Sequence, residues 1–160
     1  MTTEAMHGAL LRYYQQQQTP EGWFDLLTIM VDGMVGNVGE QECRPFLQEM
    51  GRQIGSRYPL PVCETVGDLE DAINRQLGHF NWGVIEISLT GQAMILRHRG
   101  LPVARADNDT HEQHRWCNAF SAILEGMYGL WFAALQDAPH LRLWRDHIYA
   151  FSDVQFRYQG

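Results

Sequence analysis

The sequence has 160 residues, of which 45% are hydrophobic, 19% charged and 11% aromatic, so we expect one compact globular domain rather than a disordered chain. Its 12 basic residues, all of them arginines, are outnumbered by 19 acidic residues, and the net charge of −7 argues against a nucleic-acid-binding protein. A chain of this length buries a core without help from disulfides or metal, so any metal would be functional rather than structural. We predict no cofactor.

The cysteines and the first residues of the chain indicate a reducing compartment. Cys43, Cys63 and Cys117 cannot all pair within one chain. The N-terminus has no cationic stretch followed by an apolar stretch and a small-residue cleavage site. The longest apolar stretch, residues 23–38, contains two aspartates and is too polar to span a bilayer. We therefore expect a cytoplasmic protein without a membrane span.

The first 20 residues differ in composition from the rest. They contain the pair Tyr13 and Tyr14 and a run of glutamines that begins at Gln15, with few apolar residues that could anchor them to a core. We expect residues 1–20 to form an arm or an extra helix that makes contacts, and residues 21–160 to form a single domain.

Helical periodicity predicts two helices after this arm. The first covers about residues 21–34, and its apolar positions are Phe24, Leu27 and Val31, widened by Leu26 and Met30. The second begins near residues 39–44, and its expected buried residues are Phe46, Leu47, Met50 and Ile54. Gly33, Gly36 and Gly39 indicate a helix break rather than a phosphate loop, because no lysine follows them.

The middle of the chain carries the clearest signals. Thr65 resembles the N-cap of a helix that Gly78 would close, and one face of that helix carries Val66, Leu69, Ile73 and Leu77. The period then changes to two over residues 84–89 and 93–99, which predicts an antiparallel hairpin with its turn at Gly91. Residues 101–110 have the composition of a surface loop.

The last third contains a long helix and a closing strand. The helix runs from His111 to about Gly129, with an apolar stripe formed by Trp116, Phe120, Ile123, Met127 and, if the helix continues, Trp131. Residues 130–147 fit either helix or strand, whereas Val154, Phe156 and Tyr158 alternate with polar residues as in a half-buried strand. The predicted fold class is α+β, in which N-terminal helices and a long helix of the C-terminal half pack on one side of an antiparallel sheet.

Two groups of residues could carry chemistry. His111, His114 and Cys117 lie three residues apart and could bind a transition metal, but a solvated helix start explains them better. Glu125 is the single acid in an apolar stretch, so burial would raise its pKa toward that of a general acid. A structural ion pair or hydrogen bond is the favoured interpretation of Glu125, because buried charge is usually paired.

The aromatic residues divide into two groups. Trp82, Trp116 and Trp131 lie in regular segments and are expected in the core. Trp23, Trp144 and the tyrosine pair lie in less regular sequence, where exposed rings could contact another copy of the chain or the face of a sugar.

Several short stretches together resemble the BcsD family of bacterial cellulose synthase accessory proteins over about residues 22–135. They are FLQEMGR at 46–52, CETV at 63–66 with Leu69 following, WG at 82–83 and LEGMYGLW at 124–131. The structural motif that the resemblance implies comprises Trp82, Gly83, Leu124, Glu125, Gly126, Tyr128, Gly129 and Trp131. In it the glycines allow close backbone approach or a helix end, the aromatic rings pack the helix on the sheet, and the glutamate is structural.

The resemblance also implies a function. Members are non-catalytic accessory or scaffold subunits of cellulose biosynthesis and secretion, and they form dimers that assemble into a ring-like octamer. The implied partners are a proline-rich cellulose-operon protein, the cellulose synthase complex and glucan chains. Tyr13, Tyr14, Gln15 and Trp23 are candidates for contact with glucan or a partner because of their residue types, not because of a matched motif. The expected location is the cytoplasm beside the inner-membrane synthase, with the periplasm as the alternative.

Two other functions remain open from the sequence. The order of elements also resembles small-molecule sensing modules of the vinyl-reductase-like and haem-nitric-oxide-binding type, which would place His79 or Cys117 in a ligand pocket. A carbohydrate-active hydrolase would need a second carboxylate within about 5–10 Å of Glu125.

Overall fold

The computed structural model describes residues 3, 5–6, 8–10 and 13, and then residues 22–104, 110–135 and 141–160. Its elements, in chain order, are α2 (Trp23–Val38), α3 (Glu40–Arg57), α4 (Val66–Phe80), β1 (Val84–Thr90), β2 (Ala93–Arg99), α5 (Thr110–Leu135), β3 (Arg142–Ala150) and β4 (Asp153–Gln159). Helices precede, interrupt and cover an antiparallel sheet, so the α+β class predicted from the sequence is confirmed.

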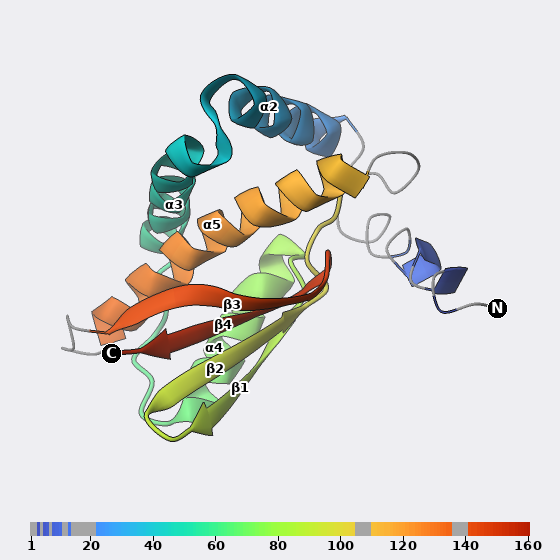
Figure 1. The fold of residues 1–160 in the computed structure, drawn as a ribbon. Helices are drawn as coiled ribbons and strands as arrows, with labels where there is room; N and C mark the ends of the chain where they lie inside the picture. Colours follow the sequence, from blue (N-terminus) through green and yellow to red (C-terminus); the bar gives the residue numbers. More distant parts are fainter. Residues whose placement is uncertain are drawn as a thin grey trace.

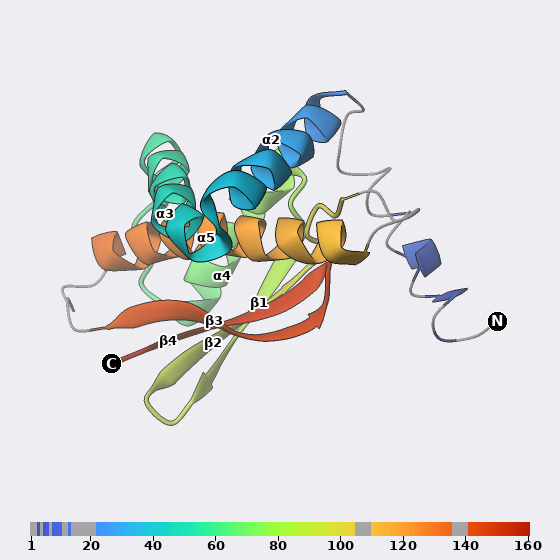
Figure 2. The ribbon, with the colours of Figure 1, turned by 45° about the horizontal axis from the view of Figure 1, so that its top comes forward.

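The sheet and helix α5 organise the molecule. The strand order is β1-β2-β4-β3, and each neighbouring pair is antiparallel. Helix α5 connects β2 to β3 and crosses the sheet, α4 lies behind the sheet near β1, and α2 and α3 lie on the side of α5 away from the sheet (Figures 1 and 2). Both sides of α5 are therefore covered, which accounts for the many buried residues along its length.

Strand β4 shows why the period-two pattern was informative. Val154, Phe156 and Tyr158 are buried against the helices, and the residues between them are partly exposed. Each member of this buried row pairs with a residue of β2 that faces the same way, so one face of the sheet forms the core. The half-buried strand predicted for the tail is confirmed.

Helix α4 begins where the sequence predicted and ends slightly later. The Oγ1 of Thr65 accepts the backbone N–H of Asp68 at 3.0 Å, which is the N-cap bond expected for this residue. The helix ends at Asn81, whose φ of +57° is in the left-handed region, rather than at Gly78. Asparagine tolerates this conformation better than most residues, so it can replace glycine at a helix end.

The three N-terminal glycines behave differently from one another. Gly33 and Gly36 lie inside α2, so the prediction that they break the helix is wrong. The break occurs at Gly39, whose φ of +99° separates α2 from α3. The structure thus retains the predicted interruption but assigns it to one glycine of the three.

The buried stripe of α2 contains fewer residues than its sequence suggests. Only Phe24, Thr28 and Val35 are buried on this helix. The expected core residues Leu26, Leu27 and Met30 are exposed, because α2 contacts α5 and α3 along a single stripe. Phe46 of α3 is likewise exposed, although Leu47 next to it is buried. Even so, no helix within the described part of the chain combines the length and apolar character that a membrane crossing needs.

The segment after β2 is buried, contrary to its prediction as a surface loop. Leu101, Val103 and Ala104 are almost inaccessible to solvent. The carbonyl of Ser152 accepts the N–H of Leu101 at 3.1 Å, and the carbonyl of Pro102 accepts the indole N–H of Trp116 at 2.9 Å. Backbone hydrogen bonds and core contacts therefore compensate the burial of a segment whose proline and polar residues suggested exposure. Residues 105–109 of the predicted loop lie outside the described part.

Helices α3 and α5 approach so closely that their backbones touch. A Cβ atom added at Gly51 would lie 1.7 Å from the carbonyl oxygen of Ile123, and one added at Gly126 would lie 1.9 Å from that of Gln48. Both distances are far below van der Waals contact, so only glycine fits at either position. The two helices can cross this closely only because Gly51 and Gly126 have no side chain.

Two glycines of the same helix provide a matched test of this crossing. Gly126→Ala should lower the free energy of unfolding by about 3 kcal/mol, since the new methyl group forces α3 away from α5. Gly129→Ala should instead raise it by about 0.5–1 kcal/mol, because a methyl group there meets no atom within 4 Å and alanine favours a helix. Urea denaturation of both variants measures the difference. Equal stability of the two variants would show that the close approach does not limit the fold.

Candidate functional site

A buried histidine joins three parts of the fold. The Nε2 of His98, on β2, lies 2.6 Å from the carbonyl oxygen of Trp82, and its Nδ1 lies 2.7 Å from the hydroxyl of Tyr128 on α5. Both His98 and Tyr128 are completely buried. The two hydrogen bonds of His98 therefore connect the loop before β1, strand β2 and helix α5.

The partners of His98 determine its protonation state. A carbonyl oxygen can only accept, so Nε2 carries the hydrogen, and Nδ1 then accepts the hydroxyl hydrogen of Tyr128. Burial lowers the pKa of His98 from 6.5 to about 4, and the hydrogen bond to Trp82 opposes this shift only in part. Burial also raises the pKa of Tyr128. The pair is a neutral, fully hydrogen-bonded structural unit rather than an acid–base couple near neutral pH.

The tryptophans of the motif pack at two junctions of the core. The ring of Trp82 lies 4.9 Å from that of Phe120 and 4.8 Å from that of Phe80, which joins the end of α4 to α5. The indole N–H of Trp131 donates to the carbonyl oxygens of Tyr58 and Gly55 at 2.9 and 3.2 Å. Trp131 thus satisfies carbonyl groups at the C-terminal end of α3 that the helix itself leaves unpaired.

The glycines of the motif have unequal surroundings. Gly83 has φ of +92°, and a Cβ there would lie 2.0 Å from the carbonyl oxygen of Arg99, so a side chain is excluded. Gly126 lies at the crossing of α3 and α5 described above. Gly129 lies inside α5, and a Cβ there would meet no atom within 4 Å, so neither close approach nor a helix end applies to it.

Glu125 is paired with arginines from two elements. Its carboxylate accepts two hydrogen bonds from a guanidinium nitrogen of Arg44, on α3, at 2.6 and 2.7 Å, and Arg145 on β3 also favours its ionised form. The side chain of Glu125 is 3% exposed, whereas that of Arg44 is 46% exposed. Burial raises the pKa of Glu125, and the two arginines oppose the rise. The carboxylate therefore joins α3, α5 and β3 and is held by cations.

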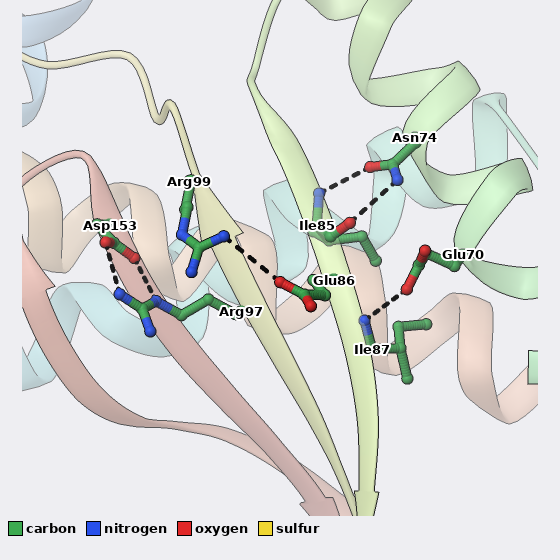
Figure 3. Close-up of polar contacts among 8 residues, drawn as sticks. All are labelled: Glu70, Asn74, Ile85, Glu86, Ile87, Arg97, Arg99 and Asp153. Carbon is green, nitrogen blue, oxygen red and sulfur yellow. Dashed lines mark hydrogen bonds and ion pairs between the residues drawn. The ribbon is translucent and has the colours of Figure 1, made fainter. Parts of the chain in front are cut away.

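The face of the sheet away from the helices carries ion pairs across its strands. The guanidinium of Arg97 binds both carboxylate oxygens of Asp153 at 2.6 and 2.8 Å, and Arg99 lies 3.4 Å from Glu86 (Figure 3). The guanidinium of Arg97 also lies 3.5 Å from the centre of the Tyr149 ring. These contacts link side chains of all four strands and support their register.

Side chains from α4 occupy the outer edge of β1. The amide of Asn74 makes two hydrogen bonds with the backbone of Ile85, at 2.7 and 3.0 Å, and Glu70 accepts the N–H of Ile87 at 2.7 Å (Figure 3). Three backbone groups that this edge strand would otherwise present to solvent are therefore satisfied within the chain.

The residues predicted to contact glucan or a partner lie apart from this core. Tyr13 and Trp23 are exposed, the latter at the start of α2. Tyr14 and Gln15 lie outside the described residues. The exposure of Tyr13 and Trp23 leaves both rings accessible, and contact with glucan or a partner stays a prediction for all four residues.

The residues considered for metal or ligand binding are also dispersed. Cys117 is buried in α5, and burial raises the pKa of its thiol, whereas the ring of His114 bonds Asn118. The described residues contain no group of three ligands arranged for a metal. A surface hollow of about 140 Å³ is lined by Cys63, Glu64, Thr65, Val66, Leu69, Met94, Phe132 and Leu135, which does not include His79 or Cys117.

His98 and Arg44, which bind Tyr128 and Glu125, were not predicted from the sequence. His98 has the same parity as Leu96 and Met94 in β2, so the alternation already assigns it to the core face. Arg44, by contrast, is 81 positions from Glu125 and carried no local signal of pairing.

Comparison with known proteins gives consistent matches. The model of the cellulose synthase D-subunit family matches residues 9–159. The protein named cellulose synthase operon protein D from Komagataeibacter xylinus is 32% identical over 90 residues, which cover 55% of this chain and 54% of the relative. A protein of the same name from Komagataeibacter sucrofermentans is 31% identical over 90 residues with the same coverage. The chain spans about half the length of the relatives it matches.

The buried histidine predicts a specific dependence of stability on pH. The folded pKa of about 4 lies below the unfolded value of 6.5, so the unfolded state binds more protons between these values and stability falls as the pH decreases through this range. His98→Gln should remove up to about 3 kcal/mol of this fall, as measured by urea denaturation at pH 4.5 and pH 7.

A second variant serves as the control for this measurement. Tyr128→Phe keeps the buried histidine but removes its hydroxyl partner, so it should lower stability by about 1–3 kcal/mol at both pH values and retain the pH slope. An unchanged slope in His98→Gln would refute the assignment to this residue.

Proposed function

The chain belongs to the cellulose synthase D-subunit family, and we propose that it is a non-catalytic accessory subunit of bacterial cellulose biosynthesis and secretion. In this role it is a scaffold that helps organise glucan export and the assembly of crystalline cellulose. Its proposed partners are further copies of itself, the cellulose synthase complex, a proline-rich protein of the same operon, and glucan chains.

The observation that carries this proposal is the structural use of the motif at residues 124–131. Leu124, Tyr128 and Trp131 are almost fully buried, and they fill the core or satisfy backbone groups of other elements. Glu125, the strongest candidate for a general acid, is buried and bound by the guanidinium of Arg44. A motif committed to packing supports a role in assembly, since catalysis requires groups that substrate can reach.

The proposed assembly is a ring-like octamer built from dimers. Residues 1–20 act as an arm that makes contacts, and residues 21–160 form the single domain of each copy. Tyr13, Tyr14, Gln15 and Trp23 are proposed contact residues for glucan or a partner protein. The proposed location is the cytoplasm beside the inner-membrane synthase, with the periplasm as the alternative.

Native mass tests the proposed ring directly. Eight chains of 18.4 kDa give a mass of about 147 kDa, and a closed symmetric ring should keep this mass at two protein concentrations and in reducing buffer. Light scattering after size exclusion measures it. A monomer or a simple dimer would contradict the ring, and an absorbing or tightly bound ligand in that species would support the sensing-module alternative.

The non-catalytic role predicts a mild effect of Glu125→Gln. The amide keeps the volume and an acceptor for Arg145, and the half-exposed Arg44 can regain water, so stability should fall by only about 1–2 kcal/mol. Cellulose output in a strain that carries this variant as its sole copy should match that of the unmodified chain. Complete loss of output from a stably folded Glu125→Gln protein would indicate catalysis at this carboxylate.

A further inference from the structure

The outward side of α2 is apolar and uncovered in the single chain. Besides Val38 at its C-terminal end, five large side chains on this helix are between 48% and 75% exposed, namely Trp23, Leu26, Leu27, Ile29 and Met30. Four of them lie on the side away from the buried stripe formed by Phe24, Thr28 and Val35, and Leu27 flanks that stripe, so α2 is hydrophobic on both sides. Helices of that kind are normally buried all round.

The spacing on the outward side is that of a helix-pairing surface. Trp23, Leu26, Met30, Gly33 and Asn37 follow one another at alternating intervals of three and four residues, which is the seam spacing of two packed helices. The flanking positions carry Leu27 and Ile29 rather than charges. Partner choice between paired helices is usually set by charges at such flanking positions, so an identical helix fits this surface as well as any other.

We propose, on the basis of the homo-oligomer proposed above, that the outward side of α2 is a two-fold interface at which α2 of one copy packs antiparallel against α2 of a second copy. A two-fold axis beside Leu26 and Met30 places the Trp23 ring of each copy over Gly33 of the other. Among the described residues, nothing outside the backbone of α2 itself lies within 4 Å of a Cβ built at Gly33, so there is room there for a large ring.

The area of this surface suits a second copy. The five side chains present on the order of 600 Å² of apolar surface per chain, close to the ~800 Å² that each partner contributes to a standard stable interface. An apolar patch of that size is rarely left exposed on a monomer.

The charges on and around α2 disfavour a lipid surface as the occupant. The helix has no basic residue, and the chain carries a net charge of −7, so an anionic bilayer would repel it. Asp32, one of the two acids of α2, forms an ion pair with Arg115 on α5, on the inner flank of the helix. The outward side is therefore neutral, and two copies can meet there without burying charge.

Charged substitutions on this side test the proposal. Leu26→Glu with Met30→Glu should reduce the native mass at least twofold relative to the unmodified chain, with an unchanged circular dichroism spectrum, because both side chains point away from the folded core. Leu89→Glu on β1 is the matched control, since Leu89 is 64% exposed and lies outside α2. The control should retain the full native mass.

Cysteine pairing tests the geometry independently of the charged variant. In a Cys63→Ser background, Leu26→Cys with Met30→Cys should give a disulfide-linked dimer on mild oxidation, seen on a non-reducing gel. Absence of that dimer overturns the antiparallel α2 pairing even if the charged variant fails to fold.

The outcomes separate this interface from the ring itself. An unmodified chain that is oligomeric, together with a folded charged variant of the same mass, overturns the α2 interface and leaves the ring standing. A monomeric unmodified chain overturns both. Equal dissociation of the Leu89→Glu control also overturns the α2 interface. Binding of the unmodified chain to phosphatidylglycerol vesicles, lost in the charged variant, would assign the surface to lipid and overturn pairing with a second copy.

Discussion

Helix α5 can be covered on both sides because glycines allow α3 to lie directly on its backbone. Gly51 and Gly126 each bring one helix within contact of a carbonyl oxygen of the other, which no residue with a side chain could do. This short separation brings Arg44 to Glu125, and it brings the end of α3 to the indole of Trp131. The sheet packs on the remaining side of α5, so this helix lies between the α2–α3 pair and the sheet (Figure 2).

Two buried groups of hydrogen-bonded side chains, around His98 and around Glu125, give the core its specificity. Hydrophobic packing tolerates many arrangements of similar volume, whereas a buried polar group is costly unless its own partner is present. His98 finds its partners only when the loop at Trp82, strand β2 and Tyr128 meet in one arrangement. Glu125 imposes the same requirement on α3 and β3. In any alternative packing these buried polar groups would lose their partners, at a cost in free energy, which favours a single native state.

The accuracy of the sequence-based predictions depended on how far the partners lay along the chain. The cap at Thr65, the hairpin turn and the alternation of β4 involve neighbouring residues, and each was predictable. The exposure of α2 and the burial of residues 101–104 depend on which surfaces meet in space, and periodicity alone misassigned both. For the site, the motif could be recognised from its residue types, but Arg44 is distant in sequence and only the folded chain brings it to the carboxylate.

The occupied edge of the sheet constrains how copies of this chain can join. Backbone groups of Ile85 and Ile87, on the edge strand β1, are bonded to side chains of α4. A strand from another molecule would have to displace these side chains before it could extend the sheet at this edge. Open-ended fibre growth by strand addition is thereby disfavoured even when many copies are crowded together during synthesis. Association is directed instead to side-chain surfaces, whose geometry can close on itself and fix the number of copies in the assembly.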